Sequence, residues 1–350
     1  MGKRAVMILL VVAVVIVFVV VLVVVLGNRG PNLRASNGCG LAPATEPGKT
    51  KTQSLVVDGL EREYRLHLPT DYDQDTPTSL LLAFHWYTGD AMTMERTSGQ
   101  STYANKENYV VVYPQSTSFE GSRKTITSWN DLSCSAGSGP EGPTCSESMW
   151  WDFPPECGEP RDCVWCTCND DLAFVDQLLD ELENTLCIDL DRVYATGVSN
   201  GAMLVHRLGC DRADRFAAIA PVAGTLSRGF NCAPDTSNPV SMIYLRGDRD
   251  LDNPTDGSEG TSGHFFVPVD AMIDAWAGAE SQGCDNSETP YPTSRDGSMG
   301  LTCVQRANCA TGAEVVSCSW EGDHWSATQI GAQFGSEVIW EFFSRNSKQR

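Results

Sequence analysis

The alternation of short apolar runs with amphipathic segments limits most strongly how this chain can fold. Apolar runs of buried-strand length lie at residues 79–85, 109–114, 192–198, 216–224, 240–247 and 313–320. Apolar residues at helical spacing occur at residues 171–186, 202–209, 269–279 and 327–343. Two further strand-like runs flank Asp58-Gly59, a dipeptide typical of a hairpin turn. Strands that alternate with helices predict an α/β fold, in which a mostly parallel sheet has helices on both faces.

The first 26 residues predict a membrane anchor. Residues 5–26 are all apolar and follow Lys3 and Arg4. As a helix this run is about 33 Å long, enough to cross a bilayer. The basic flank favours a cytoplasmic N-terminus, so we expect a single-pass type II protein with an extracellular or lumenal domain. Cleavage of a signal peptide from a secreted protein is the alternative, although VVVLGNRG lacks an A-x-A-like cleavage site.

Composition divides the rest of the chain into a linker and one domain. Residues 27–50 are rich in Gly, Pro, Asn and Ala, which is typical of a stalk, and Cys39 is placed to tie it to the domain. Residues 51–345 hold the alternating strands and helices. Within them, residues 133–168 form an irregular insert with six cysteines. Such a long irregular segment is usually functional when its cysteines argue against disorder.

Cysteine usage and charge exclude several classes of function. All 14 cysteines follow the apolar run, which predicts seven disulfides in an oxidising compartment. The net charge of −20 disfavours nucleic acid and anionic membrane surfaces as partners. No metal site is expected. The cysteines at 163, 166 and 168 are better explained as disulfides, and an EF-hand-like run of acids from 248 to 259 has Asn253 where glycine is needed.

The motif Gly197-Val-Ser199-Asn-Gly201 lies between a predicted strand and a predicted helix. A nucleophile elbow needs this context because the serine must sit on a sharp turn above the sheet. The flanking positions must be small, since the turn brings them against neighbouring backbone. The N-terminus of the following helix then favours developing negative charge. We therefore predict that Ser199 is a nucleophile.

A serine nucleophile needs a base, and the base needs an orienting carboxylate. In the α/β-hydrolases the order along the chain is Ser, acid, His, each at a strand end. His324 directly follows the last predicted strand, whereas His264 precedes a helix, so His324 is the better candidate. The acid is expected after the strand at 240–247, where three aspartates compete: Asp248, Asp250 and Asp252.

Two backbone N–H groups must bind the oxyanion. One is expected from Asn200, the residue after the nucleophile, and the other from Trp86 or Tyr87 in the loop after residues 79–85. His85 in the same loop is expected to be buried and to shape the loop without transferring protons.

Seven blocks of this sequence resemble one known group. In order they are SLLLAFHWYTGDA, YVVVYPQS, SWND, NDDLAFVDQLLDEL, the long block CIDLDRVYATGVSNGAMLVHRLGCDRADRFAAIAPVAGT, YLRGDRD and EGDHW. They are similar to the secreted feruloyl esterases and polyhydroxybutyrate depolymerases of the α/β-hydrolase superfamily, over about residues 54–343. The resemblance implies that Ser199 is the nucleophile and His324 the base. It selects Asp250 as the acid, and His85-Trp86 favours the feruloyl esterase side of the group.

This chain departs from the pattern of that group at the insert, residues 133–168. Because residues 133–168 fall between a strand end and a helix, we expect them to form a disulfide-stapled rim near the active site. Trp150 and Trp151 would then stack on a substrate ring; alternatively they form a small core beneath the disulfides.

The sequence thus predicts a serine esterase without a cofactor, acting on feruloyl or similar aryl esters of polysaccharide. A polyhydroxyalkanoate depolymerase is the enzymatic alternative, and a catalytically silent, membrane-tethered binding domain is the alternative of another class.

Overall fold

The computed structural model describes residues 33–132, 138–139, 142–146, 154, 167–226, 228, 232, 236–326 and 335–348. The chain divides into two compact units, Met1–Arg34 and Ala35–Arg350. The fold described below is that of the second unit. In the described ranges, no helix combines the length and the apolar character that a membrane span requires. The predicted anchor at residues 1–26 lies outside these ranges.

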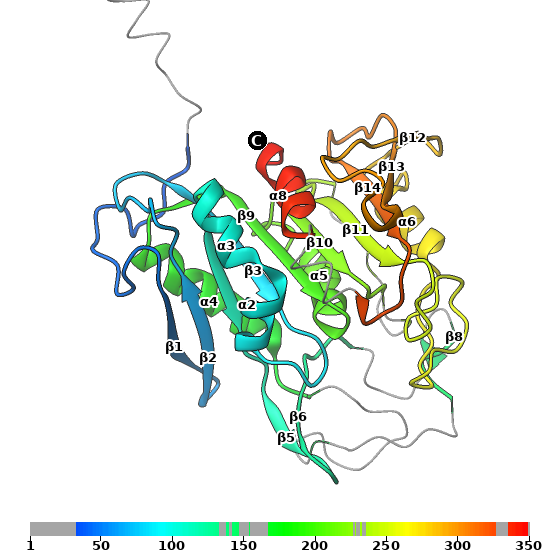
Figure 1. Ribbon diagram of the computed structural model, residues 1–350, viewed down its shortest axis with the longest axis horizontal. Helices are drawn as coiled ribbons and strands as arrows, with labels where there is room; N and C mark the ends of the chain where they lie inside the picture. Colours follow the sequence, from blue (N-terminus) through cyan, green and yellow to red (C-terminus); the bar gives the residue numbers. More distant parts are fainter. Residues whose placement is uncertain are drawn as a thin grey trace, which may run out of the picture. The chain divides into compact units, whose positions relative to one another are not determined.

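A mixed sheet forms the centre of this unit (Figure 1). Its described strands run in the order β1-β2-β4-β3-β9-β10-β11-β14-β13-β12. The middle six pair in parallel, and the outer two on each side are antiparallel. In that order the bounds are Thr50–Val57, Leu60–His67, Val110–Pro114, Thr78–Phe84, Ile188–Val198, Ala218–Val222, Ser241–Gly247, Val315–Trp320, Thr302–Arg306 and Glu288–Pro290. The mostly parallel sheet predicted from the sequence is confirmed.

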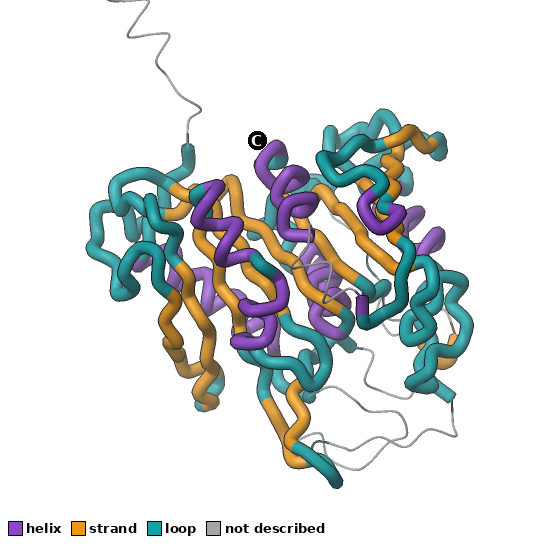
Figure 2. Tube along the Cα trace, viewed as in Figure 1, coloured by secondary structure: helices purple, strands orange, loops and turns teal. Residues whose placement is uncertain are grey.

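Helices cover both faces of the sheet, and each face has its own apolar core (Figure 2). One core contains buried residues of α4 (Asp171–Thr185), α5 (Asn200–Asp211) and α6 (Val269–Ala277). The other contains those of α2 (Ala91–Ser98), α3 (Gln100–Glu107) and α8 (Ser336–Arg345). The central strands are buried on both sides, which explains their continuous apolar runs.

Small elements lie outside the main sheet. A hairpin joins β5 (Ser118–Glu120) to β6 (Thr125–Thr127), and β7 (Ser138–Gly139) pairs with β8 (Gly142–Pro143). A 3-10 turn, η2, spans Ser298–Gly300. None of these was expected from the sequence, and neither were α2, α3, β12 and β13. Only the C-terminal part of the helix predicted at 327–343 falls within the described ranges.

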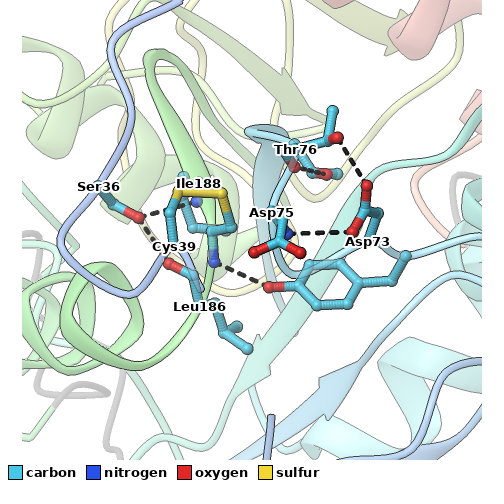
Figure 3. The surroundings of a disulfide bond; sticks show 10 residues. Ser36, Cys39, Asp73, Asp75, Thr76, Leu186 and Ile188 are labelled. Atoms are coloured by element: carbon cyan, nitrogen blue, oxygen red, sulfur yellow. Dashed lines mark hydrogen bonds between the residues drawn. A yellow bond between two sulfur atoms is a disulfide. The ribbon is translucent and has the colours of Figure 1, made fainter. Parts of the chain in front are cut away.

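The compact unit begins at Ala35, earlier than the boundary at residue 51 that composition suggested. Cys39 forms a disulfide with Cys187, 148 residues further along the chain. Beside it, the Ser36 hydroxyl donates to the Leu186 carbonyl at 2.5 Å and accepts from the Ile188 N–H at 2.9 Å (Figure 3). Long-range contacts of this kind hold residues 35–50 on the domain, and a composition rich in Gly and Pro does not reveal them.

Disulfides link several parts of the domain. Three further pairs are Cys210–Cys232, Cys284–Cys309 and Cys303–Cys318. Cys145 and Cys168 are also disulfide-bonded, so that every cysteine in the described ranges is oxidised. This agrees with the expectation of an oxidising compartment, because such bonds rarely persist in the cytosol.

Candidate active site

Ser199 lies on a sharp turn between β9 and α5, above the carboxyl end of the parallel strands. Its backbone has φ 56° and ψ −120°, a conformation that costs free energy in a non-glycine residue. A Cβ at Gly197 would come within 2.5 Å of the Gly201 carbonyl oxygen. A Cβ at Gly201 would come within 2.5 Å of the His85 carbonyl oxygen. The close approach of the end of β9, the start of α5 and the loop after β3 therefore requires glycine on both sides of the serine.

A hydrogen-bonded chain joins Ser199 to two residues far along the sequence. His324 Nε2 lies 3.0 Å from Ser199 Oγ, and His324 Nδ1 lies 2.8 Å from Asp250 Oδ2. A carboxylate only accepts, so Nδ1 carries the proton and Nε2 is left to accept from the serine hydroxyl. Asp250 is 5 % exposed, and its second oxygen accepts the N–H groups of Asp252 and Asn253 at 3.0 and 2.8 Å. These bonds fix the direction in which the carboxylate points.

The three competing aspartates occupy different positions. Asp250 alone of the three bonds to His324. Asp248 accepts the Gly322 N–H at 2.9 Å and so supports the loop that carries His324. Asp252 lines the pocket at Ser199 and accepts a hydrogen bond from the Thr261 hydroxyl. Burial raises the pKa of Asp252, and the nearby His324 opposes that shift. His264, the rejected base, is buried away from this chain of bonds, with its Nδ1 at 3.2 Å from the Ser262 carbonyl oxygen.

The side chain of Asn200 connects the turn to the segment Ser128–Asp131. Its Oδ1 accepts the Trp129 N–H at 2.8 Å and the Ser128 hydroxyl at 3.3 Å. Its Nδ2 donates to Asp131 Oδ2 at 2.8 Å and to the Trp129 carbonyl at 3.2 Å. We call this set of four bonds the Asn200 clamp. The clamp uses only the side chain of Asn200. The backbone N–H of Asn200 lies in the first turn of α5, where N–H groups lack partners within the helix.

The loop after β3 faces the turn from the other side. His85 is fully buried; its Nδ1 lies 2.8 Å from the Trp86 carbonyl oxygen, and its Nε2 accepts the Ser116 N–H at 3.2 Å. Burial lowers the pKa of His85 to about 4, so the ring is neutral near pH 7. The indole N–H of Trp129 donates to the His85 carbonyl at 2.8 Å. His85 thus shapes this loop, as the sequence suggested.

A pocket of about 250 Å³ opens at Ser199 and His324. This volume is just below the usual range for small-molecule sites, about 300–1,000 Å³. Trp86 and Tyr87, whose backbone N–H groups are predicted to bind the oxyanion, line this pocket. Sequence reasoning missed most of the other lining residues, which come from several loops, the end of β9 and α5: Thr88, Lys124, Val198, Met203, Asn253, Ser262, Phe266 and Trp325.

The hairpin β5–β6 braces the loop at Trp86. The Thr88 N–H donates to the Thr127 carbonyl at 2.8 Å, and the Thr127 hydroxyl donates to the Gly89 carbonyl at 2.5 Å. The turn of this hairpin carries Lys124, which lines the pocket. No local sequence signal connects residues 118–127 with the loop at 86–89.

Part of the insert lies beside the pocket. Cys145 forms an antiparallel bridge with His264, and the Phe265 N–H donates to the Thr144 carbonyl at 3.0 Å. The paired segment, residues 263–265, is flanked by Ser262 and Phe266, which line the pocket. Trp150 and Trp151, the predicted rim residues, lie outside the described ranges.

Comparisons with known proteins bear on the chemistry of this site. No family model matches the chain. Feruloyl esterase C of Emericella nidulans is 24% identical over 310 residues, which are 88% of this chain and 90% of that protein. Feruloyl esterase D of Neurospora crassa is 25% identical over 315 residues, 89% and 90% of the two chains.

Among solved structures, an acetyl xylan esterase from Aspergillus awamori superposes with a TM-score of 0.52 at 13% identity. The match covers 84% of this chain and 99% of that one, and it supports the α/β-hydrolase-like fold. The two feruloyl esterase relatives decide the class of enzyme. The chain is a carboxylic ester hydrolase. The resemblance of this esterase to feruloyl esterases, stated above from sequence blocks, is also confirmed.

Proposed function

We propose that this esterase uses Ser199, His324 and Asp250 as a catalytic triad and releases feruloyl or similar aryl acids from polysaccharide. The observation that carries the proposal is the unbroken chain of hydrogen bonds from Ser199 Oγ through His324 to Asp250. The similarity to feruloyl esterases supports an aryl acid, and the pocket of about 250 Å³ is of a size for one substituted ring.

The reaction proceeds in two balanced halves. Ser199 Oγ attacks the ester carbonyl carbon while His324 Nε2 takes the hydroxyl proton, and Asp250 holds the resulting imidazolium. The backbone N–H of Asn200 and one from Trp86 or Tyr87 hold the negative oxygen. The carbon–oxygen bond to the alcohol breaks, and His324 returns its proton to the departing oxygen. Water then attacks the acyl group by the same route, which frees the acid and restores Ser199.

Labelling with a fluorophosphonate probe tests the nucleophile. We expect the folded ectodomain to be labelled, Ser199→Ala to escape labelling, and Ser54→Ala, an exposed serine of the β1–β2 hairpin, to label like the wild type. Equal labelling of the wild type and Ser199→Ala would refute the triad. A wild type that is not labelled at all would favour a silent binding domain.

The substrate class needs a separate measurement. Release rates from methyl ferulate, short p-nitrophenyl esters and a hydroxybutyrate oligomer can be compared at equal concentration. We expect methyl ferulate to be hydrolysed fastest. A preference for the oligomer would instead indicate a polyhydroxyalkanoate depolymerase.

We also propose that residues 1–26 anchor the esterase as a single-pass type II membrane protein. The support is the length of the apolar run and its basic flank. Sequencing the N-terminus of the protein recovered from membranes tests this, because a signal peptide would have been removed.

A further inference from the structure

Trp325 lies between two hollows of the esterase surface. The first is the pocket of about 250 Å³ at Ser199. The second has a volume of about 500 Å³ and is lined by Arg249, Gly322, Asp323, Trp325 and Ser326. Of the described residues that line these two hollows, Trp325 is the one that they share. It is 61 % exposed, although most large apolar side chains of this domain are buried.

The chemistry of the proposed triad places the alcohol part of the ester toward this second hollow. The departing alcohol oxygen must receive its proton from His324 Nε2, so the alcohol lies on the imidazole side of the scissile bond. Trp325 follows His324 in the chain, and the two ring centroids are 5.8 Å apart at an interplanar angle of 89°. An alcohol that leaves past His324 therefore meets Trp325 and, beyond it, the second hollow.

The second hollow has the mixed character that suits a sugar. Arg249, with 70 % of its side chain exposed, supplies N–H donors, and its Nε lies 3.5 Å from Asp248 Oδ1. One oxygen of Asp323 accepts the Ser326 N–H at 2.9 Å, and a carboxylate has further lone pairs for ligand hydroxyls. The indole of Trp325 offers an apolar face next to these polar groups. Sugar hydroxyls can accept from Arg249 and donate to Asp323, whereas a plain alkyl group can do neither.

We propose that the hollow formed by Arg249, Asp323, Trp325 and Ser326 binds the saccharide that carries the ester. The apolar C–H face of the sugar ring lies on Trp325, and its hydroxyls bond to Arg249 and Asp323. The acyl group occupies the pocket at Ser199. This inference rests on the proposed triad, because the position of the alcohol follows from the direction in which His324 delivers its proton.

The test compares two esters of the same acid. For each variant of the ectodomain, kcat/KM is measured on methyl ferulate and on a feruloylated xylo-oligosaccharide, and the ratio of the two is the readout. We expect Trp325→Ala to lower the preference for the sugar ester about tenfold, and Trp325→Phe to lower it less than about threefold. Arg249→Gln should lower the ratio as well, whereas Arg123→Gln, which lines neither hollow, should leave it at the wild-type value.

An equal loss on both esters in Trp325→Ala would overturn the proposal, because it would mean that Trp325 only supports His324. An unchanged ratio would overturn it too. Binding of an unesterified xylo-oligosaccharide to Ser199→Ala, followed by calorimetry, separates this inference from the triad, since it requires no turnover. We expect Trp325→Ala in that background to weaken binding about tenfold, and equal binding would refute the subsite.

Discussion

Replacing Asn200 by alanine tests how the turn at Ser199 is held in place. The substitution removes the four hydrogen bonds of the Asn200 clamp, among them the bond to the Asp131 carboxylate, in a region where Asp131 is 1 % exposed. A hydrogen bond to a buried charge contributes about 1.5–3 kcal/mol, and a buried N–H that loses its acceptor costs about 1–3 kcal/mol. We therefore expect the free energy of unfolding to fall by about 3–5 kcal/mol.

The same change should slow catalysis, because the first turn of α5 begins at Asn200. A displacement of about 1 Å at a reacting group can cost on the order of 100-fold in rate, so we expect kcat on a p-nitrophenyl ester to fall about 10- to 100-fold. Urea unfolding and steady-state kinetics measure the two effects. Asn184→Ala is the matched control, since that exposed asparagine makes one side-chain bond, to Asn37. Its expected loss is below about 0.5 kcal/mol.

A double substitution refines the test. Asn200→Asp alone places a second carboxylate against Asp131 and should be more damaging than Asn200→Ala. Adding Asp131→Asn restores one carboxylate and one amide, and should recover part of the lost stability. If Asn200→Ala unfolded at the same urea concentration as Asn184→Ala, or if the double variant recovered nothing, the clamp as described would be refuted.

Two further predictions follow from the same site and its surroundings. Asp250→Asn presents an amide N–H to His324 Nδ1 and so favours the wrong tautomer; kcat on p-nitrophenyl acetate should fall on the order of 10⁴-fold, and a loss below about tenfold would contradict the role of Asp250. Burial lowers the pKa of His206 to about 3. Between about pH 6.5 and that value the unfolded chain holds a proton that the folded chain lacks, so stability falls as the pH falls. In urea titrations, His206→Gln should reduce this dependence by about 1.4 kcal/mol per pH unit, and an unchanged slope would show that His206 does not titrate in this way.

The proposed triad could be predicted from the sequence because its members follow three strands of the parallel part of the sheet. Ser199 follows β9, Asp250 follows β11 and His324 follows β14, and the carboxyl ends of parallel strands meet at one edge of the sheet. The order along the chain therefore predicted the proximity. It did not separate the three aspartates after β11, because that choice depends on the direction in which a loop turns.

Contacts between distant loops could not be predicted in the same way. Asn200 and Trp129 are 71 residues apart, and neither residue type indicates the other. Pairing between Thr144 and Phe265 likewise joins an irregular insert to another loop, with no periodic pattern to detect. The helices α2 and α3 were not predicted because they are short and polar and have few buried residues to give a periodic apolar pattern.

The disulfide between Cys39 and Cys187 has a mechanical consequence. Cys187 directly precedes β9, the strand that ends next to Ser199. Tension on the chain N-terminal to the domain would first meet the hydrogen bonds of Ser36 and would then pass through this covalent bond to the base of a central strand. It would bypass the hairpin β1–β2, which otherwise comes first along the chain and would be peeled from the sheet edge. An esterase held by its N-terminal end would thus bear the load along β9, the strand that the proposed nucleophile Ser199 follows, and the hairpin β1–β2 would stay paired.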